Sequence, residues 1–209
     1  MCIEKNDLAR PVEQAALARF TDAMRAWHWS PRSIESYEQD LGLFFRWLRE
    51  ETRIRALAHI SAETLSAYQI ALLTTPKRDG TPLAAATQHR RLSAVRAFFR
   101  FLVAEGALAV DPAASLQLPK VRHGIPHELP AAKETIRMLD AIDITTPLGL
   151  RNRAILEVLY ATGIRSAELR ALTLADVDAE ARVLAVRRGK GGNDRIVPLG
   201  PVAAAILAE

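Results

Sequence analysis

Residues 87–102 read TQHRRLSAVRAFFRFL, a stretch with two stripes of side chains at helical spacing. The first stripe is apolar and consists of Leu92, Val95, Phe99 and Leu102. The second is polar and basic and consists of His89, Ser93, Arg96 and Arg100. Steps of three and four residues place side chains on one face of a helix. The stretch therefore predicts a helix, from about residue 83 to 105, with a buried face and a basic face, and Gly106 is placed to end it.

Upstream, the same spacing predicts three more helices. The first has an apolar face formed by Leu17, Phe20, Met24 and Trp27. Ser30 and Pro31 supply an N-cap and a first-turn proline for the second; its apolar residues are Ile34, Tyr37, Leu41, Phe44 and Leu48. Ser61 can cap the third, which carries Leu65, Tyr68 and Leu72. A basic loop, TPKRDGTP at residues 75–82, precedes the fourth helix. Residues 13–108 are thus predicted to form a compact four-helix domain.

Prolines change the pattern after the fourth helix. Pro112, Pro119, Pro126 and Pro130 interrupt helical spacing, which predicts an interdomain linker at residues 109–128. Helices are expected at residues 131–142, 150–161 and 166–172, and Pro201 opens a last one. Between them, residues 181–187 and 195–199 are rich in valine, leucine and isoleucine and flank a glycine-rich turn, as in a β-hairpin. The fold class expected is mainly α, with a second, α+β domain at residues 129–209.

Composition excludes several classes of protein. The 209 residues include 49% hydrophobic and 25% charged side chains, the range of globular proteins. No apolar run approaches the roughly 20 residues of a membrane span, and the N-terminus lacks a secretory segment, so a cytoplasmic protein without membrane contact is expected. The single cysteine, Cys2, excludes an intrachain disulfide and a cysteine-based metal cluster. A net charge of +4 is compatible with a polyanionic partner without requiring one.

Three groups of residues could carry chemistry. The basic stripe of the fourth helix can lie against phosphates, although a solvated helix face explains it equally well. In the second group, LYATGIRSAEL at residues 159–169, Gly163 permits a sharp turn and Glu168 can hold the guanidinium of Arg165 in one orientation. An oriented arginine suits phosphoryl transfer. An ordinary surface ion pair is the alternative.

The third group is the hairpin turn, RGKGGND at residues 188–194. Lys190 on such a turn can reach a nucleic-acid groove, and an ammonium group can donate a proton to a leaving alkoxide. The spacing of a phosphate-binding P-loop is not met, because no earlier glycine and no following Ser or Thr stand at the required positions. A solvent-exposed turn is the alternative.

Together these segments resemble the tyrosine recombinase, or phage integrase, family, and most closely its Xer-type members. The resemblance rests on ATGIRSAEL at 161–169, LTLADVD at 172–178 and VRRGKGGNDRIVPL at 186–199. It extends to SIESYEQDLGLFFRW at 33–47 and to the basic helix, and covers about residues 13–209. It implies a SAM-like core-binding domain that binds DNA, followed by a truncated catalytic domain.

The resemblance also implies a function, DNA strand breaking and rejoining in site-specific recombination and integration. Arg165 is the expected catalytic arginine, Glu168 its support, and Lys190 the general acid. The expected DNA-binding residues are Lys77, Arg78, His89, Arg90, Arg96, Arg100 and Arg188. The expected partners are double-stranded DNA and other recombinase protomers, with no metal and no cofactor.

The nucleophilic tyrosine of the family is expected beyond residue 209. Tyr37 and Tyr68 lie on helices of the front domain and Tyr160 precedes the arginine motif, so none matches its position. The chain alone is therefore expected to bind DNA without cleaving it. A DNA-binding protein without catalysis and a helical protein-interaction module remain as alternatives, which salt-sensitive DNA binding would separate.

Overall fold

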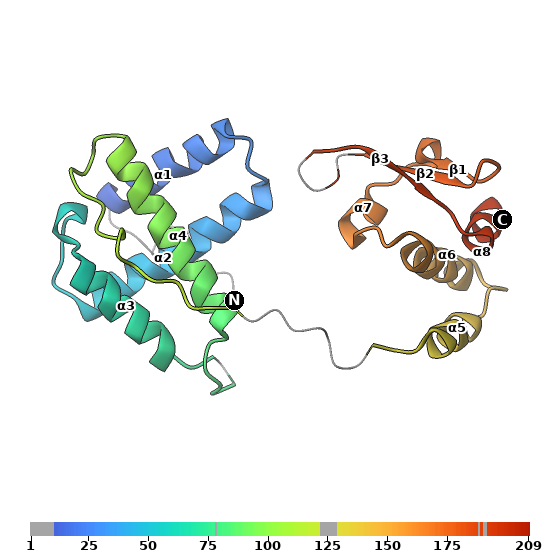
Figure 1. Cartoon of the computed structure of the whole chain (residues 1–209), viewed down its shortest axis with the longest axis horizontal. Coiled ribbons are helices and arrows are strands. Elements are labelled where there is room, and N and C mark those ends of the chain that lie inside the picture. The colour runs from blue at the N-terminus through green and yellow to red at the C-terminus, as the bar shows by residue number, and fades with distance from the viewer. Residues whose placement is uncertain (1–10, 78, 122–128, 188, 190–191) are drawn as a thin grey trace. The chain divides into compact units, whose positions relative to one another are not determined.

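The computed structural model describes residues 11–77, 79–121, 129–187, 189 and 192–209. It divides into two compact units, Met1–Gly124 and Ile125–Glu209, which are described one at a time (Figure 1). Within the described ranges, no helix combines the length and the apolar character needed to cross a membrane.

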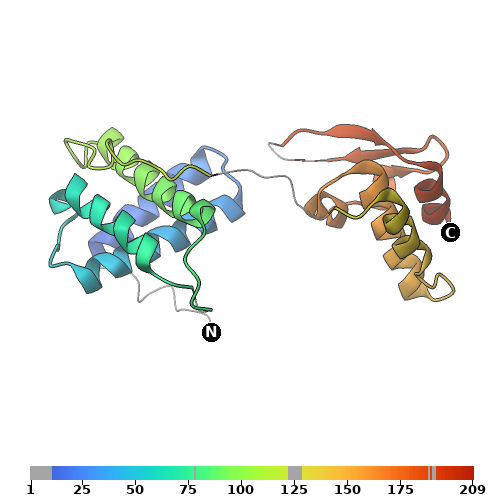
Figure 2. The same cartoon turned by 60° about the horizontal axis from the view of Figure 1, so that its bottom comes forward.

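Unit 1 consists of the four predicted helices. They are α1 (Pro11–Ala26), α2 (Pro31–Glu51), α3 (Ala62–Thr74) and α4 (Ala85–Ala104), with a short 3-10 helix, η1 (Leu57–His59), before α3. Helix α4 contacts each of the other three (Figure 2). The side chains of Ser30 and Ser61 cap α2 and α3 as predicted, accepting the N–H groups of Ser33 at 3.1 Å and Thr64 at 3.3 Å.

The core of unit 1 is aromatic and centres on α4. The predicted apolar stripe of α4 is buried, and the rings of Phe98 and Phe99 are fully enclosed. The Phe98 ring lies edge-on to Phe20 of α1 at 5.7 Å and to Phe45 of α2 at 5.6 Å. Such edge-on pairs add specific geometry to the burial of large apolar surface. The Phe98 ring of α4 thus packs against both α1 and α2.

Trp27 is a correction to the predicted face of the first helix. Its side chain is exposed rather than buried. The reason is that α1 ends at Ala26, and the chain then turns through His28 in the left-handed region at φ 57°. The three-and-four spacing therefore no longer describes the backbone at residue 27.

The first part of the predicted linker is packed on unit 1. Ala113 and Leu116 belong to the buried core. Gln69 of α3 donates a hydrogen bond to the Gln117 carbonyl at 2.9 Å, and the His89 Nδ1–H donates to the Pro119 carbonyl at 2.9 Å. Residues 107–121 therefore fold back against α3 and α4.

Unit 2 combines helices with a small antiparallel sheet of order β1-β2-β3. Its helical elements are α5 (Ala132–Asp140), α6 (Pro147–Thr162), α7 (Ser166–Arg170), the 3-10 helix η2 (Leu174–Asp176) and α8 (Pro201–Ala208). Its strands are β1 (Val177–Asp178), β2 (Val183–Val186) and β3 (Arg195–Pro198). The predicted hairpin is confirmed, with Val186 paired to Arg195 and Val183 to Pro198. Strand β1 was not predicted, because two residues are too short to show alternation.

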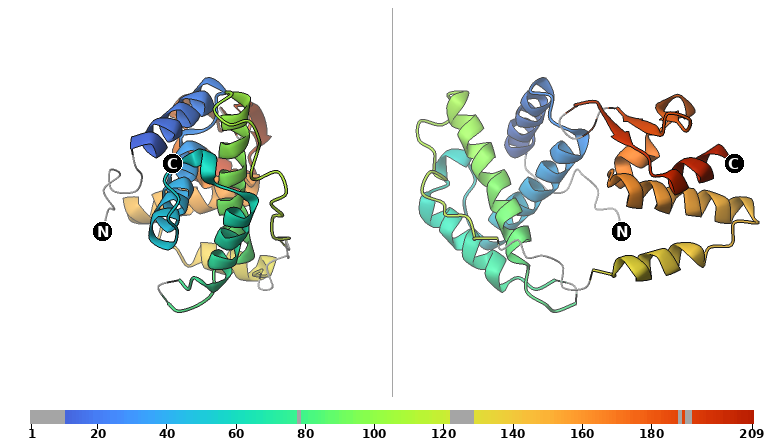
Figure 3. Two further views of the ribbon diagram at one scale, coloured as in Figure 1. Left: turned by 90° about the vertical axis from the view of Figure 1, so that its left-hand side faces the viewer. Right: turned by 45° about the vertical axis from the view of Figure 1, so that its right-hand side comes forward.

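The core of unit 2 lies between α6, β2 and α8. It includes Val158, Leu184, Val186 and Ala203, and α6 and α8 lie side by side (Figure 3). Helix α6 begins three residues earlier than predicted, because Pro147 is its first residue and Thr146 accepts the Gly149 N–H at 3.1 Å. Packing of Val158, Leu184 and Val186 in this core thus fixes the position of the last turns of α6 and of the hairpin.

Candidate functional site

The end of α6 sets the position of Arg165. Gly163 closes the helix in the left-handed conformation, at φ 63° and ψ 19°, and its N–H donates to the Leu159 carbonyl at 2.9 Å. Glycine adopts this conformation without the steric cost that other residues meet. Ile164 is then buried in the core, and Arg165 follows as the N-cap of α7. The turn thus anchors Ile164 in the core, while the side chain of Arg165, the next residue, is exposed.

Glu168 holds Arg165 in the way the sequence predicts. The carboxylate accepts the backbone N–H of Arg165 at 2.9 Å through Oε2 and the Arg165 Nη1–H at 3.0 Å through Oε1. The Glu168 side chain is only 6% exposed, whereas that of Arg165 is 57% exposed. Within the described residues, the other guanidinium donors of Arg165 have no hydrogen-bond partner. The exposed guanidinium is therefore oriented and still has donors available for an anion.

Arg195 is the second arginine on the same carboxylate. Its Nη1 donates to Glu168 Oε1 at 3.0 Å and its Nη2 to Oε2 at 2.7 Å. A bidentate guanidinium–carboxylate pair has a defined geometry and strong, charge-assisted bonds. Sequence reasoning noted Arg195 only as a flank of the turn, because a partner 27 residues away gives no local signal.

The hydrogen bonds keep Glu168 ionised. Those from the Arg195 side chain, together with that from the Arg165 N–H, lower the pKa of Glu168 to about 2, against the opposing effect of burial. Two guanidinium groups around one carboxylate leave a net charge of one positive unit. The cluster is therefore suited to attract a singly charged anion such as a phosphodiester.

The hairpin turn lies directly against this cluster. A Cβ on Gly189 would stand 2.7 Å from Arg195 Nη1 and 3.1 Å from Glu168 Oε1. The turn is closed by hydrogen bonds from the Gly189 N–H to the Asn193 carbonyl at 2.9 Å and from the Gly192 N–H to the Gly189 carbonyl at 2.8 Å. Glycine at 189 thus allows the backbone to approach the ion pair. Lys190 and Arg188, predicted as general acid and DNA ligand, lie outside the described residues.

The other strand of the hairpin is held by a second buried carboxylate. Arg187, directly after β2, donates through Nε to Asp176 at 2.6 Å. Asp176 also accepts the N–H and the hydroxyl of Thr173, at 2.9 and 2.7 Å. Hydrogen bonds from Arg187 and then from Thr173 lower the pKa of Asp176 to about 2. Both ends of the turn are therefore tied to the segment that follows Arg165.

The DNA-binding residues predicted in unit 1 fall into two kinds. Lys77 and Arg100 are exposed and Arg96 is partly exposed. His89 is bonded to the Pro119 carbonyl, and Arg90 donates to Asp40 at 2.5 Å and to Ser36 at 2.6 Å. The first kind is open to solvent, while the second also has partners within unit 1. Arg78 lies outside the described residues.

Asp40 is a structural group rather than a candidate ligand. Its side chain is 1% exposed and is contacted by Arg90 and, at 4.0 Å, by Arg91. Burial raises the pKa of Asp40 despite the opposing charges of these two arginines. The pair of Asp40 with Arg90 joins α2 to α4.

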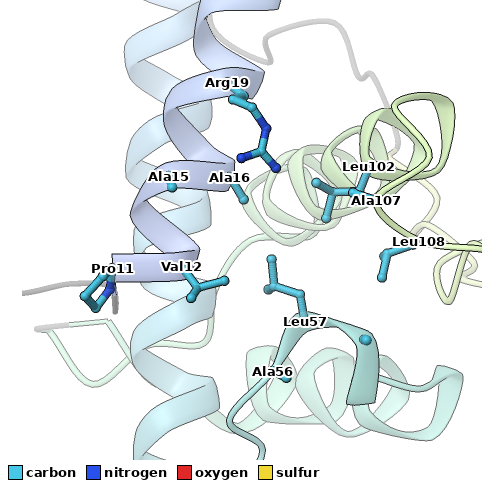
Figure 4. Close-up of a pocket in the computed structure, with 11 residues that line it drawn as sticks. Pro11, Val12, Ala15, Ala16, Arg19, Ala56, Leu57, Leu102, Ala107 and Leu108 are labelled. Carbon is cyan, nitrogen blue, oxygen red and sulfur yellow. The ribbon is translucent and has the colours of Figure 1, made fainter.

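The described part of unit 1 has hollows of its own. One, of about 500 Å³, is lined mainly by alanine, leucine and valine side chains of α1, η1 and the end of α4 (Figure 4). Its one charged residue, Arg19, pairs with Glu105 at 3.2 Å. Among the described residues, no group of three or more histidine, cysteine or acidic side chains is placed to hold a metal ion.

The three tyrosines of the chain have different surroundings. Tyr68 is buried on α3, and burial raises its pKa. Tyr37 packs against the core of unit 1, and Tyr160 is exposed on α6. That none of them is the nucleophile stays a prediction, which rests on the family resemblance.

Family models match both units. Residues 15–106 match the N-terminal SAM-like domain of phage integrases, and residues 131–209 match the phage integrase family. The chain therefore belongs to the tyrosine recombinase, or phage integrase, family. Within it, the chain is similar to XerC proteins. It is 36% identical over 205 residues to tyrosine recombinase XerC 2 of Ralstonia nicotianae, a match that covers 94% of this chain and 58% of the relative.

Other relatives give the same result. Tyrosine recombinase XerC of Myxococcus xanthus is 37% identical over 170 residues, covering 81% of this chain and 53% of the relative. The chain thus spans somewhat more than half the length of these curated relatives.

Solved structures support the fold. A lambda integrase dimer bound to a COC′ core site matches 93% of this chain and 67% of its own, with a TM-score of 0.67 and 19% identity. A lambda integrase tetramer bound to a Holliday junction matches 96% and 52%, with a TM-score of 0.66 and 19% identity. These structural relatives are bound to DNA as dimers and tetramers.

Proposed function

We propose that the chain is the DNA-binding front part of a site-specific recombinase that breaks and rejoins DNA through a phosphotyrosine. Residues 13–108 are the proposed core-binding domain and residues 129–209 the beginning of the catalytic domain. The observation that supports this most is the oriented, solvent-exposed guanidinium of Arg165 on the buried carboxylate of Glu168. Duplex DNA and further protomers are the proposed partners.

In the proposed reaction, the Arg165 guanidinium donates hydrogen bonds to the oxygens of the scissile phosphate. Negative charge increases on these oxygens in the transition state, so a donor held in place beforehand stabilises that state more than the ground state. Glu168 keeps Arg165 oriented, and Lys190 protonates the departing 5′ oxygen. A tyrosine hydroxyl loses its proton and attacks the scissile phosphorus, and the bond from phosphorus to the 5′ oxygen breaks. The 3′-phosphotyrosyl bond that forms conserves the energy of the phosphodiester.

The 209-residue polypeptide itself is proposed to bind DNA without cleaving it. Tyr37 and Tyr68 pack in the core of unit 1, and Tyr160 precedes the Arg165 motif, a position that the family resemblance does not assign to the nucleophile. Incubation with a nicked duplex that traps covalent complexes should give no protein–DNA adduct on a denaturing gel. An adduct that disappears in Tyr160→Phe would contradict this part of the proposal.

Binding can be tested by fluorescence anisotropy with duplex DNA over a salt series. We expect affinity to fall steeply with salt, because lysine and arginine contacts release counterions from the duplex. Arg165→Ala should weaken binding about tenfold and lower the salt slope by about one unit. The matched control is Arg170→Ala, which removes the same charge from the exposed side of α7, where the Arg170 Nε–H donates to the Ser166 carbonyl at 3.3 Å.

The control decides what the result means. Equal losses in the two variants would reduce the role of Arg165 to a general surface charge. Absence of salt-sensitive binding would favour the alternative of a helical protein-interaction module.

A further inference from the structure

Arg165 and Arg195 share one carboxylate whose acceptor positions are filled. A carboxylate has about four lone-pair sites. Glu168 accepts the backbone N–H and the Nη1–H of Arg165, and both Nη groups of Arg195. Because Arg195 occupies a position on each oxygen, Arg165 makes a single side-chain bond and not a bidentate one.

We propose that Arg195 is a positioning residue for Arg165. By holding Glu168 with two parallel hydrogen bonds, it fixes the carboxylate and prevents Arg165 from pairing bidentately with it. The remaining donors of Arg165 thereby stay available for a phosphate. This inference rests on the proposed function of Arg165 as the phosphate ligand.

The packing around the pair supports a fixed geometry. The Gly189 backbone lies so close that an added Cβ would stand 2.7 Å from Arg195 Nη1 and 2.9 Å from the Asn193 carbonyl. The Glu168 side chain is 6% exposed and that of Arg195 38% exposed. The carboxylate therefore has little room to move while Arg195 is present.

Loss of Arg195 should change the pairing of Arg165. Two acceptor positions on a buried carboxylate would become free, and an unpaired buried acceptor is costly. The flexible, exposed Arg165 side chain can fill them by turning onto Glu168. The result is an Arg165 with fewer donors directed outward, although no phosphate contact has been removed directly.

Nuclear magnetic resonance of the 209-residue chain tests this without DNA. The arginine side-chain Nε–H signal of Arg165, assigned by its loss in Arg165→Ala, is compared in the wild type, Arg195→Gln and Arg195→Lys. Both substitutions should shift the signal, because neither side chain can form the bidentate pair with Glu168. Lysine keeps the charge but lacks the planar fork. The matched control is Arg187→Gln, an arginine at the other end of the same turn that pairs with Asp176 and not with Glu168. It should leave the Arg165 signal in place.

A thermodynamic cycle with duplex DNA tests the consequence for binding. Arg195→Gln should weaken binding roughly five- to tenfold, a coupling typical of residues in one hydrogen-bond network. In the Arg165→Ala background the same substitution should change affinity less than about twofold. An undiminished loss in that background would show that Arg195 contacts DNA on its own account, which overturns the proposal.

The two measurements separate failure of this inference from failure of the proposed function. If Arg165→Ala leaves DNA affinity unchanged while the Arg165 signal still responds to Arg195→Gln, the phosphate role of Arg165 is wrong and the positioning stands. If Arg165→Ala weakens binding but its signal ignores Arg195, the positioning is wrong. Should Arg195→Gln fail to fold, Gly189→Ala displaces the pair with every charge retained and should shift the Arg165 signal too; an unchanged signal in a folded Gly189→Ala protein would overturn the proposal.

Discussion

At the scale of single residues, what the sequence could predict was set by distance along the chain. Arg165 and Glu168 are three residues apart, so helical geometry alone predicts that they meet. Arg195 joins them from strand β3, and its contact depends on the register of β2 against β3. The role of Gly189 could not be predicted from the sequence either, because only the folded turn shows that a Cβ at this position would collide with the ion pair.

Glu168 and Asp176, two buried carboxylates of unit 2, should make its stability depend on acid pH. Hydrogen bonds lower the pKa of Glu168 and of Asp176 to about 2, below the ordinary values of 4.5 and 3.8. Groups with depressed folded pKa values stabilise the fold above their unfolded pKa and lose that contribution as pH falls towards the folded one. We therefore expect the free energy of unfolding of unit 2 to fall between about pH 4.5 and pH 2.

Urea unfolding of the chain between pH 6 and pH 2 measures this dependence. Glu168→Gln removes one of these two hydrogen-bonded carboxylates, so its curve should be flatter over this interval. A curve for Glu168→Gln as steep as that of the wild type would argue against an ionised, hydrogen-bonded Glu168.

At the scale of elements, periodicity predicted the helices well and their ends less well. The apolar stripes of α2, α3 and α4 are buried as predicted. The ends depend on single residues instead. Thr146 starts α6 earlier than its apolar pattern does, and the turn at His28 removes Trp27 from the face of α1. Strand β1 has no pattern of its own and forms because β2 is beside it.

The start of α3 offers a direct test of a predicted cap. Ser61 and Thr64 bond reciprocally, each side chain to the other's backbone N–H, at 3.3 and 3.4 Å. Ser61→Ala should lower the free energy of unfolding of unit 1 by about 1 kcal/mol, because the Thr64 N–H at the helix end loses the hydroxyl that accepts it. Thermal or urea unfolding measures the change.

Ser66→Ala is the matched control on the same helix. Ser66 is exposed, and its hydroxyl bonds only to the Ala62 carbonyl one turn earlier. Alanine is the better helix former, so the control should be neutral or slightly stabilising. Equal destabilisation by both substitutions would show that the cap contributes nothing particular.

At the scale of the whole molecule, the chain contains two separate hydrophobic cores. One is built on α1 to α4 and the other on α6, β2 and α8, and they have no residue in common. Each unit carries a different group of candidate DNA-contacting residues. These are the basic stripe in unit 1 and the Arg165 cluster in unit 2. The sequence predicts a division between two domains from its prolines and its change of composition. Both are local features of the chain, so no knowledge of tertiary contacts is needed to find them.

Core substitutions should therefore act on one unit at a time. Leu92→Ala removes a fully buried side chain from unit 1, and Leu184→Ala does the same in unit 2. Each should cost about 2–5 kcal/mol in its own unit and leave the other unit's unfolding unchanged. Amide hydrogen exchange resolves the two units residue by residue. Loss of protection in both units from either substitution would contradict independent cores.

The shared carboxylate of Glu168 has a consequence for how the cluster responds to its surroundings. With a pKa of about 2, Glu168 keeps its negative charge over the whole pH range that cells experience, so its titration does not change the charge of the cluster. Its attraction for an anion is thus a constant of the molecule and cannot be switched by acidification. If DNA binding by this chain varies between pH 6 and pH 8, the proton responsible must be sought on another group, such as a histidine.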